Sequence, residues 1–176
     1  MTLRRRTLSV TVPIGLSALM LTVAGSLSTA SAATNWQYQN EHEGTCLASS
    51  PTTSSVWTAS CNGTFSWVSW HWGAQSYTSW DGHVMRRLVS NANGGCLTTN
   101  LDGNSTANAV WTEPCGHAVP QFWTGDDNRL KNDIGQGRWL GLRTSDNGSA
   151  VYTDYYSVVD SHNIDPSSFV WWGVHD

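Results

Sequence analysis

Val56-Trp57-Thr58-Ala59-Ser60-Cys61 is a six-residue stretch that the chain repeats, with changes, twice more. The second copy reads Val110-Trp111-Thr112-Glu113-Pro114-Cys115, and the third reads Val151-Tyr152-Thr153-Asp154-Tyr155-Tyr156. Valine, a large aromatic residue and threonine keep the same order in each copy. A cysteine ends the first two copies, whereas Tyr156 ends the third. The chain therefore contains three related units.

Matching residues flank each copy of this hexapeptide. A piece containing glycine precedes each copy, and a tryptophan follows it. The preceding pieces are Gly44-Thr45-Cys46-Leu47, Gly94-Gly95-Cys96-Leu97 and Gly137-Arg138-Trp139-Leu140, and the following tryptophans are Trp67, Trp123 and Trp171. A repeat with this period marks supersecondary units that share one core. We predict a single domain over residues 33–176, with repeats at about 36–84, 85–127 and 128–176, and we expect the three tryptophans to fill its core.

The first 32 residues have the pattern of a secretory signal peptide. Arg4, Arg5 and Arg6 form a positive head, a mostly small and apolar run follows, and Ala30-Ser31-Ala32 supplies a small-x-small cleavage site. A membrane anchor fits less well because Pro13 and several Ser and Thr residues interrupt the run. We therefore expect residues 33–176 to be secreted and to leave the membrane when the signal is removed.

The charge of residues 33–176 excludes some partners. Six Lys and Arg face 13 Asp and Glu there, which is a formal charge of −7 with His neutral. Nucleic acids and anionic membranes need clustered Lys and Arg, so neither is an expected partner.

All four cysteines lie in residues 33–176, and export to an oxidising space makes disulfides the default. Four cysteines allow three connectivities. The repeat selects Cys46–Cys61 and Cys96–Cys115, because each pair brackets the same piece of its unit. A zinc site is the rival interpretation, but no Cys-x-x-Cys spacing occurs and the histidines are scattered. We expect no metal and no cofactor.

The residues after the signal predict an all-β fold. Helical spacing of apolar residues is hard to find, and Gly, Asn, Ser and Thr interrupt the chain about every ten residues. We expect the first strand of each unit at 36–40, 87–90 and 129–132. The Gly-containing pieces and the hexapeptides should form the second and third strands. Residues 68–83 and 157–168 are insertions in the first and third units.

Side-chain alternation within the hexapeptide points to a function. Successive residues of a strand face opposite sides, so the second and fourth positions share one face. Unpaired Glu113 and Asp154 at the fourth position would be costly to bury, so this face should meet water. The aromatic residue at the second position, Trp57, Trp111 or Tyr152, should then be partly exposed. The ring either covers the neighbouring disulfide or loop, or offers a platform on which the C–H face of a sugar stacks.

These three units, with Gly-x-Cys-Leu, a downstream cysteine and Gln121-Phe122-Trp123, resemble the ricin B-type β-trefoil lectins. Within that group, the stretch from Val56 to Gly63 is most similar to the actinohivin-like secreted bacterial trefoils, which carry Val-Tyr-Thr-x-x-Cys-Asn-Gly and bind mannose-type glycans. The resemblance covers essentially all of residues 33–176. It implies a β-trefoil with a six-stranded barrel capped by three hairpins, and one shallow sugar pocket possible per unit.

The resemblance also locates candidate sugar-binding residues. The family's asparagine after the second cysteine matches Asn62, and its stacking aromatic matches the ring of each hexapeptide. Its sugar-binding Asp, two residues after the first cysteine, is missing, since Ala48, Thr98 and Gly141 stand there. We therefore expect weak binding of free galactose and mannose. The candidate residues, ranked by unit, are Trp57 and Asn62 first, then Trp111, Glu113 and Asn100, then Tyr152 and Asp154.

Enzymatic functions find little support. Glu41-His42-Glu43 lacks the second histidine of a zinc protease, and no Gly-x-Ser-x-Gly elbow occurs. The carboxylates show no spacing that singles out a glycosidase pair. We expect a non-catalytic, monomeric domain that binds glycans or polysaccharide. The alternative is a secreted β-trefoil that inhibits proteases or binds other proteins through a projecting loop at 68–83 or 157–168.

Overall fold

The computed structural model describes residues 33–62, 66–100, 106–116, 118–134, 137–145, 148–159 and 161–175, within one compact unit, Ala32–Asp176. The predicted signal peptide lies outside the described residues. Those residues form strands and short 3₁₀ turns but no α-helix, and they contain no helix that could span a membrane. The strands are β1 (Asn35–Asn40), β2 (Cys46–Ser49), β3 (Val56–Ala59), β4 (Trp70–Thr78), β5 (Val84–Ser90), β6 (Cys96–Thr99), β7 (Val110–Glu113), β8 (Phe122–Thr124), β9 (Lys131–Asp133), β10 (Trp139–Thr144), β11 (Val151–Tyr155) and β12 (Trp171–His175). The 3₁₀ turns are η1 (Ser66–Val68), η2 (Val119–Gln121), η3 (Asp126–Asn128), η4 (Tyr156–Val158) and η5 (Pro166–Phe169).

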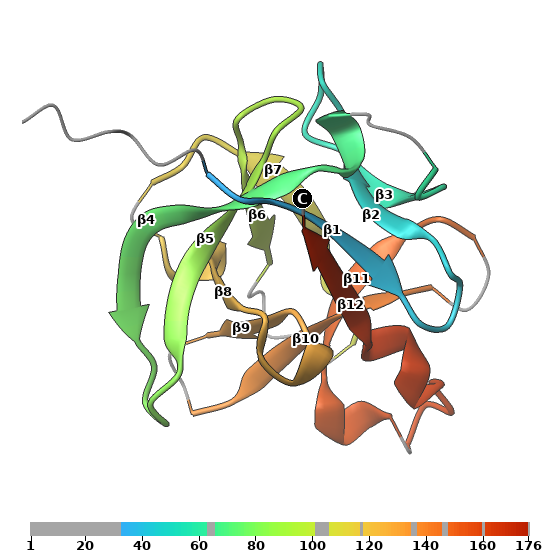
Figure 1. Cartoon of the computed structure of the whole chain (residues 1–176). Helices are drawn as coiled ribbons and strands as arrows, with labels where there is room; N and C mark the ends of the chain where they lie inside the picture. Colours follow the sequence, from blue (N-terminus) through green and yellow to red (C-terminus); the bar gives the residue numbers. More distant parts are fainter. Residues whose placement is uncertain are drawn as a thin grey trace, which may run out of the picture. The chain divides into compact units, whose positions relative to one another are not determined.

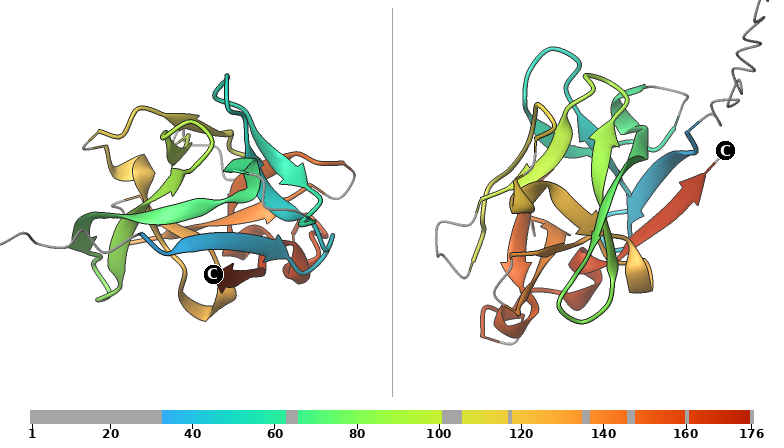
Figure 2. Two further views of the ribbon diagram at one scale, coloured as in Figure 1. Left: turned by 45° about the horizontal axis from the view of Figure 1, so that its top comes forward. Right: turned by 90° about the vertical axis from the view of Figure 1, so that its left-hand side faces the viewer.

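The strands form three units of four. One strand at each end of a unit belongs to the barrel, whose strands pair in the order β12–β1–β4–β5–β8–β9. The middle strands of each unit form a hairpin, which gives β2–β3, β6–β7 and β10–β11. β12 runs beside β1, so the last strand of the domain pairs with the first (Figures 1 and 2). This arrangement is the β-trefoil that the resemblance implied.

The hexapeptides form the third strand of each unit, in one register. Their threonines lie opposite a buried leucine of the second strand, in the pairs Leu47–Thr58, Leu97–Thr112 and Leu142–Thr153. All three threonines are buried, and the valines pack on or within the core. The predicted orientation of the valine and threonine face is confirmed.

In the third unit, the pairing of β10 with β11 differs from the alignment that the sequence repeat predicted. The sequence pattern placed Leu140 with the core leucines, but Leu142 occupies that place. Gly137 has a left-handed φ of 70°, as do the matching Gly44 and Gly94 at 67° and 71°, so the turn itself was aligned correctly. Two more residues separate this turn from the core leucine in the third unit. Periodicity alone could not show this, because a shift of two preserves the face of every side chain.

Three tryptophans fill equivalent places in the core. Trp70, Trp123 and Trp171 are each at most 1 % exposed. Their indole N–H groups donate to the backbone carbonyls of Leu47, Leu97 and Leu142, at 2.9, 2.8 and 2.9 Å. The prediction that Trp67 fills the first of these places is wrong. Trp67 lies on η1 and is 38 % exposed, and Trp70, three residues later, lies in the core.

The buried threonines also connect the units to one another. The backbone N–H of Thr58 donates to Ser149 of the third unit at 2.7 Å, and that of Thr112 donates to Ser54 of the first unit at 2.8 Å. The N–H of Thr153 donates to Asn108 of the second unit at 3.0 Å. Each hairpin thus receives a hydrogen bond from one neighbour and donates one to the other. The recurrence of threonine at the third position places a small buried residue at each of these junctions.

The two disulfides are Cys46–Cys61 and Cys96–Cys115, as the repeat predicted. Each joins the start of a second strand to the segment just after the third strand. In both, the Cα atoms lie 5.1 Å apart, within the range of ordinary disulfides. The bridges therefore hold the base of the first two hairpins.

Reduction should destabilise the domain without changing its fold. The closed loops span 15 and 19 residues, and such loops contribute about 3 kcal/mol each in the chain-entropy model. We expect the free energy of unfolding to fall by a few kcal/mol when both bridges are reduced. Urea unfolding with and without reductant measures this. Mass mapping of the unreduced protein is the control, and a Cys46–Cys96 link would contradict the pairing.

The two insertions are ordered in different ways. Residues 68–83 are mostly β4 and the turn that leads into β5, so a long β4–β5 hairpin joins the first unit to the second (Figure 1). Residues 157–168 contain η4 and the start of η5 in the third unit. Ile164 and Phe169 are buried there with Val158. The first insertion is thus largely paired strand, whereas the second is mostly exposed and is anchored by a few buried side chains.

Candidate functional site

The aromatic residues of the hexapeptides occupy equivalent outer positions on the hairpins. Trp57, Trp111 and Tyr152 lie opposite Ala48, Thr98 and Arg143 of the second strands. All three rings are partly exposed, as side-chain alternation predicted. The position that the family gives to its sugar-binding Asp is therefore held by Ala48, Thr98 and Arg143, and Gly141 is not part of this set.

In the first unit, Trp57 packs against buried residues beside the first disulfide. It contacts a small cluster made by Cys46, Ala48 and Val68, with Cys61 at its edge. This contact corresponds to the packing interpretation of the ring. The exposed Asn62 follows the second cysteine. Its backbone N–H donates to the hydroxyl of Ser60 at 3.3 Å, while its side chain faces solvent.

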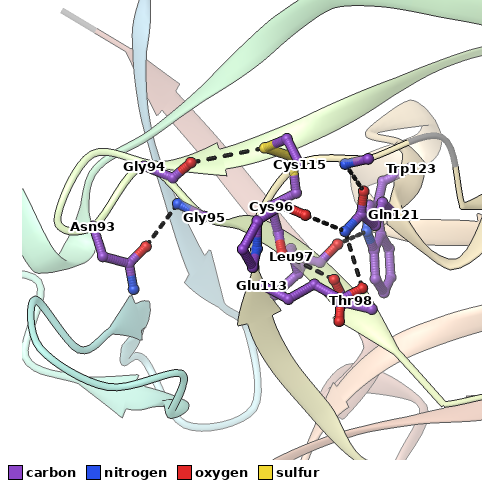
Figure 3. The surroundings of a disulfide bond; sticks show 12 residues. Asn93, Gly94, Gly95, Cys96, Leu97, Thr98, Glu113, Cys115, Gln121 and Trp123 are labelled. Carbon is purple, nitrogen blue, oxygen red and sulfur yellow. Dashed lines mark hydrogen bonds between the residues drawn. A yellow bond between two sulfur atoms is a disulfide. The ribbon is translucent and has the colours of Figure 1, made fainter.

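In the second unit, a carboxylate lies beside the aromatic ring. The indole N–H of Trp111 donates to Oε2 of Glu113 at 3.3 Å. The side-chain amide of Gln121 donates to Oε1 of Glu113 at 3.0 Å (Figure 3) and to the carbonyl of Pro114 at 3.1 Å. The carbonyl oxygen of this amide accepts from the backbone N–H of Gly116 at 2.8 Å. Glu113 is thus held in place while part of its side chain remains exposed.

Gln121, which in the sequence is part of the Gln-x-Trp signature, also belongs to this site. It is 1 % exposed and lies two residues before the core Trp123. The corresponding places in the other units are held by Val68 and Phe169, which cannot hold a carboxylate by hydrogen bonds. The sequence distinguishes Gln121 by its polarity, since the same position holds an apolar residue in the first and third units.

Asn100 and Glu113 lie at opposite ends of the second hairpin. Asn100 follows β6, and its backbone N–H donates to the carbonyl of Ala109 at 3.1 Å at the far end of the hairpin. Glu113 lies opposite Cys96 at the other end. Asn100 lies four residues along the strand from Cys96, the residue opposite Glu113, and this spacing corresponds to roughly 13 Å.

In the third unit, Asp154 is fully buried, so the prediction that it meets water is wrong. One carboxylate oxygen accepts from Nε of Arg143 and the other from the backbone N–H of Ala107. Nη1 of Arg143 donates to the carbonyl of Thr144 at 2.8 Å, and its guanidinium lies 5.4 Å from the centre of the Tyr152 ring. Side-chain alternation correctly placed Asp154 on the same strand face as Tyr152. Burial of its carboxylate is possible because the buried Arg143 compensates the negative charge.

The third unit also replaces the disulfide. Tyr156 stands where the other units have their second cysteine, and Gly141 stands where they have the first. A Cβ atom at Gly141 would lie 2.5 Å from the Tyr156 ring, so the ring occupies the space of a side chain there. The ring of Phe169 lies 5.1 Å from that of Tyr156, centre to centre. Burial raises the pKa of Tyr156 to about 12. An apolar contact thus takes the place of the covalent bridge.

The comparisons with known proteins agree with this architecture. No protein-family model and no curated protein sequence matches the chain. Among solved structures, it is similar to the β-trefoil lectin of the Vibrio vulnificus hemolysin/cytolysin with N-acetyl-D-lactosamine bound, with 19% identity and a TM-score of 0.60 over 83% of this chain and 97% of that one. The designed three-fold symmetric protein ThreeFoil has 18% identity and a TM-score of 0.59, over 80% of this chain and 97% of its own. The C-terminal half of an earthworm R-type lectin in complex with GalNAc has 12% identity and a TM-score of 0.54, over 81% and 99%. The chain has the β-trefoil fold that these proteins share.

Proposed function

We propose that this protein is a non-catalytic domain that binds glycans through its second unit. The observation that carries the proposal is the pair formed by Trp111 and Glu113, with the carboxylate held by the buried Gln121. The two lectins named above were solved with N-acetyl-D-lactosamine and GalNAc, which supports a glycan as the ligand class. We also propose, from the sequence of residues Val56 to Gly63, that the domain is related to the actinohivin-like trefoils.

The chemistry of this pair suits a sugar. A pyranose presents an apolar C–H face that can stack on the exposed part of the Trp111 ring, and hydroxyls that can donate to the Glu113 carboxylate. Because Gln121 already fixes the carboxylate, little side-chain entropy is lost when a hydroxyl binds. Stacking and one good hydrogen bond together contribute about 2 kcal/mol, or roughly thirty-fold in affinity.

The structure leads us to reverse the order of the first two units. The sequence ranked the unit of Trp57 and Asn62 first. However, Trp57 packs against the cluster of Cys46, Ala48 and Val68, and Ala48, the residue opposite it, offers no polar side chain. The third unit keeps Tyr152, but Arg143 and the buried Asp154 bind each other. We therefore propose the second unit as the main site, with Trp57 and Asn62 as a weaker one.

The proposal also includes secretion. The apparent signal peptide at residues 1–32 would direct export, and an oxidising compartment would allow the two observed disulfides to form. Detection of a mature N-terminus at or near Ala33 in culture medium tests this part separately from glycan binding.

Substitutions in the second unit should weaken glycan binding. A glycan array identifies the tightest ligand, and isothermal titration then measures its affinity for the variants. We expect Trp111→Ala and Glu113→Gln each to weaken binding about fivefold, and the double variant to weaken it about thirty-fold. Trp57→Ala is the matched control, because it removes the same residue type from the equivalent position of another unit.

Circular dichroism of each variant confirms that the fold persists. We expect Trp57→Ala to change affinity little but to lower stability, because Trp57 packs against the buried cluster of Cys46, Ala48 and Val68. If Trp57→Ala abolishes binding while Trp111→Ala does not, the main site lies in the first unit. If no glycan binds, glycan binding is not the function.

A further inference from the structure

A second concave site lies on the barrel, away from the hairpins. It is a cavity of about 430 Å³, within the range of roughly 300–1,000 Å³ that small-molecule sites occupy. Its lining residues come from β1, β4, β5, β8, β12 and the segment around η3, and none comes from the hairpins that carry Trp57, Trp111 and Tyr152. Among the described residues, β9 and β12 form no strand pairing, and η3 lies against β12 instead. The cavity therefore lies where a turn, rather than a paired strand, forms part of the barrel wall.

Aromatic rings make up much of this cavity. Trp36 and Tyr38 are stacked nearly parallel, with ring centres 6.1 Å apart and an angle of 11° between the planes. Trp72 stands almost perpendicular to Tyr38, at 6.3 Å and 81°. Tyr38 is buried, and burial raises the pKa of its hydroxyl. Trp36 and Trp72 remain partly exposed and can therefore contact a ligand.

Two glycines allow these rings to take their positions. A Cβ atom at Gly173 would lie 3.1 Å from atoms of both Trp36 and Tyr38, and one at Gly125 would lie 3.3 Å from the Trp72 ring. Both glycines line the cavity. Side chains at these positions would push against the rings, so the aromatic walls depend on their absence.

The deeper part of the cavity is apolar. Trp123 and Trp171 line it, and both are almost fully buried. Their indole N–H groups already donate to the carbonyls of Leu97 and Leu142. They therefore offer a ligand only ring surface and no free donor.

Polar groups of complementary kinds surround this apolar surface. Arg86 is exposed, and its guanidinium makes no ion pair among the described residues. The carboxylate of Asp126 accepts from the Thr124 hydroxyl at 2.7 Å and contacts Nδ1 of His83 at 2.5 Å. The Thr124 hydroxyl, aided by His83, holds the pKa of Asp126 below its ordinary value, so Asp126 is an acceptor at neutral pH. Asn128, with a φ of 54°, adds an amide that both donates and accepts.

We propose that this barrel cavity binds one pyranose unit of a glycan, stacked on Trp36 or Trp72 and hydrogen-bonded by Arg86, Asp126 and Asn128. Sugar hydroxyls both donate and accept, which matches a rim with a donor-only, an acceptor-only and a mixed side chain. A purely apolar ligand would offer these rim side chains no hydrogen-bond partner. A simple anion would gain from Arg86 but meet the charge of Asp126, and a simple cation would meet the reverse. This site is independent of the hairpin site proposed above.

Nuclear magnetic resonance of the ¹⁵N-labelled protein tests the proposal directly. Each indole N–H gives its own signal, and Trp36→Phe and Trp72→Phe assign the two that matter. The probes are lactose, cellobiose, maltose and N,N′-diacetylchitobiose, with hexanoate and choline as anionic and cationic controls. We expect at least one disaccharide to shift the Trp36 or Trp72 signal, while the signal of Trp172, exposed on β12 but outside the cavity, stays in place. Shifts of the Trp111 signal report the hairpin site separately, so either proposal can fail alone.

Two substitutions at the rim then identify the contacts. Arg86→Ala and Asp126→Asn are exposed changes that should each weaken the interaction roughly tenfold, as expected for a hydrogen bond to a charged group. The proposal fails if no disaccharide moves either cavity signal, or if hexanoate or choline moves them and the sugars do not. It also fails if the shifts appear but the affinity is unchanged in both rim variants.

Discussion

Replacing Trp70 by alanine should lower the free energy of unfolding by about 3–5 kcal/mol, the range seen when a large aromatic is removed from a core. Trp70 is fully buried, and its indole N–H is bonded to the carbonyl of Leu47. The substitution would leave both a cavity and an unpaired carbonyl. Urea unfolding with the disulfides intact measures the loss, which is a large part of the total stability of an ordinary domain.

Trp67→Ala is the matched control, because it removes the same residue three positions earlier. Trp67 is 38 % exposed on η1, so its loss should cost no more than about 1 kcal/mol. Equal losses from the two variants would mean that both tryptophans contribute to the core. A larger loss of stability from Trp67→Ala than from Trp70→Ala would mean that Trp67 fills this place in the core, as the sequence pattern predicted.

Replacing Asp154 by alanine should have an effect of similar size. The side chain is fully buried, and it accepts hydrogen bonds from Arg143 and from the backbone of Ala107. Its removal leaves the guanidinium of Arg143, itself 7 % exposed, buried without its counter-charge. Breaking a buried ion pair by removing one partner costs about 3–5 kcal/mol. Chemical unfolding of the variant at neutral pH measures this cost.

The double variant with Arg143→Met and Asp154→Leu separates charge from packing. It removes both charges and keeps apolar volume, so it should recover much of the stability that Asp154→Ala loses. Glu113→Gln is a second control, because Glu113 occupies the equivalent position but remains partly exposed, and it should change stability by less than about 1 kcal/mol. If Asp154→Ala and Glu113→Gln have equal effects on stability, the buried pair has no special structural role.

The hexapeptide and its flanking pieces were enough to predict the fold, because they determine which side of the third strand faces the core in each unit. The Val and Thr positions point to the core, the aromatic position points outward, and the bracketing cysteines identify the disulfides. A three-fold repeat constrains each unit by the other two. These features depend on alternation and spacing, which a sequence displays directly.

Features that depend on one particular partner could not be predicted in this way. Trp67 and Trp70 both follow the first hexapeptide, and only packing shows which of them enters the core. The place of Asp154 depends on Arg143, whose position shifted by two residues from the aligned pattern. Gln121 matched a family signature, but its bond to Glu113 required the geometry of the turn around η2.

The bonds that connect the hairpins form a closed circle. The first unit donates to the third, the third to the second, and the second to the first, through Thr58, Thr153 and Thr112. In this circle no unit comes first or last, and an isolated unit or pair would lack an acceptor. Since β12 also runs beside β1, the first and last strands of the domain are neighbours within this cyclic structure. The native contacts would therefore be kept in a circularly permuted chain, with residues 175 and 33 joined by a short linker and the β4–β5 turn opened.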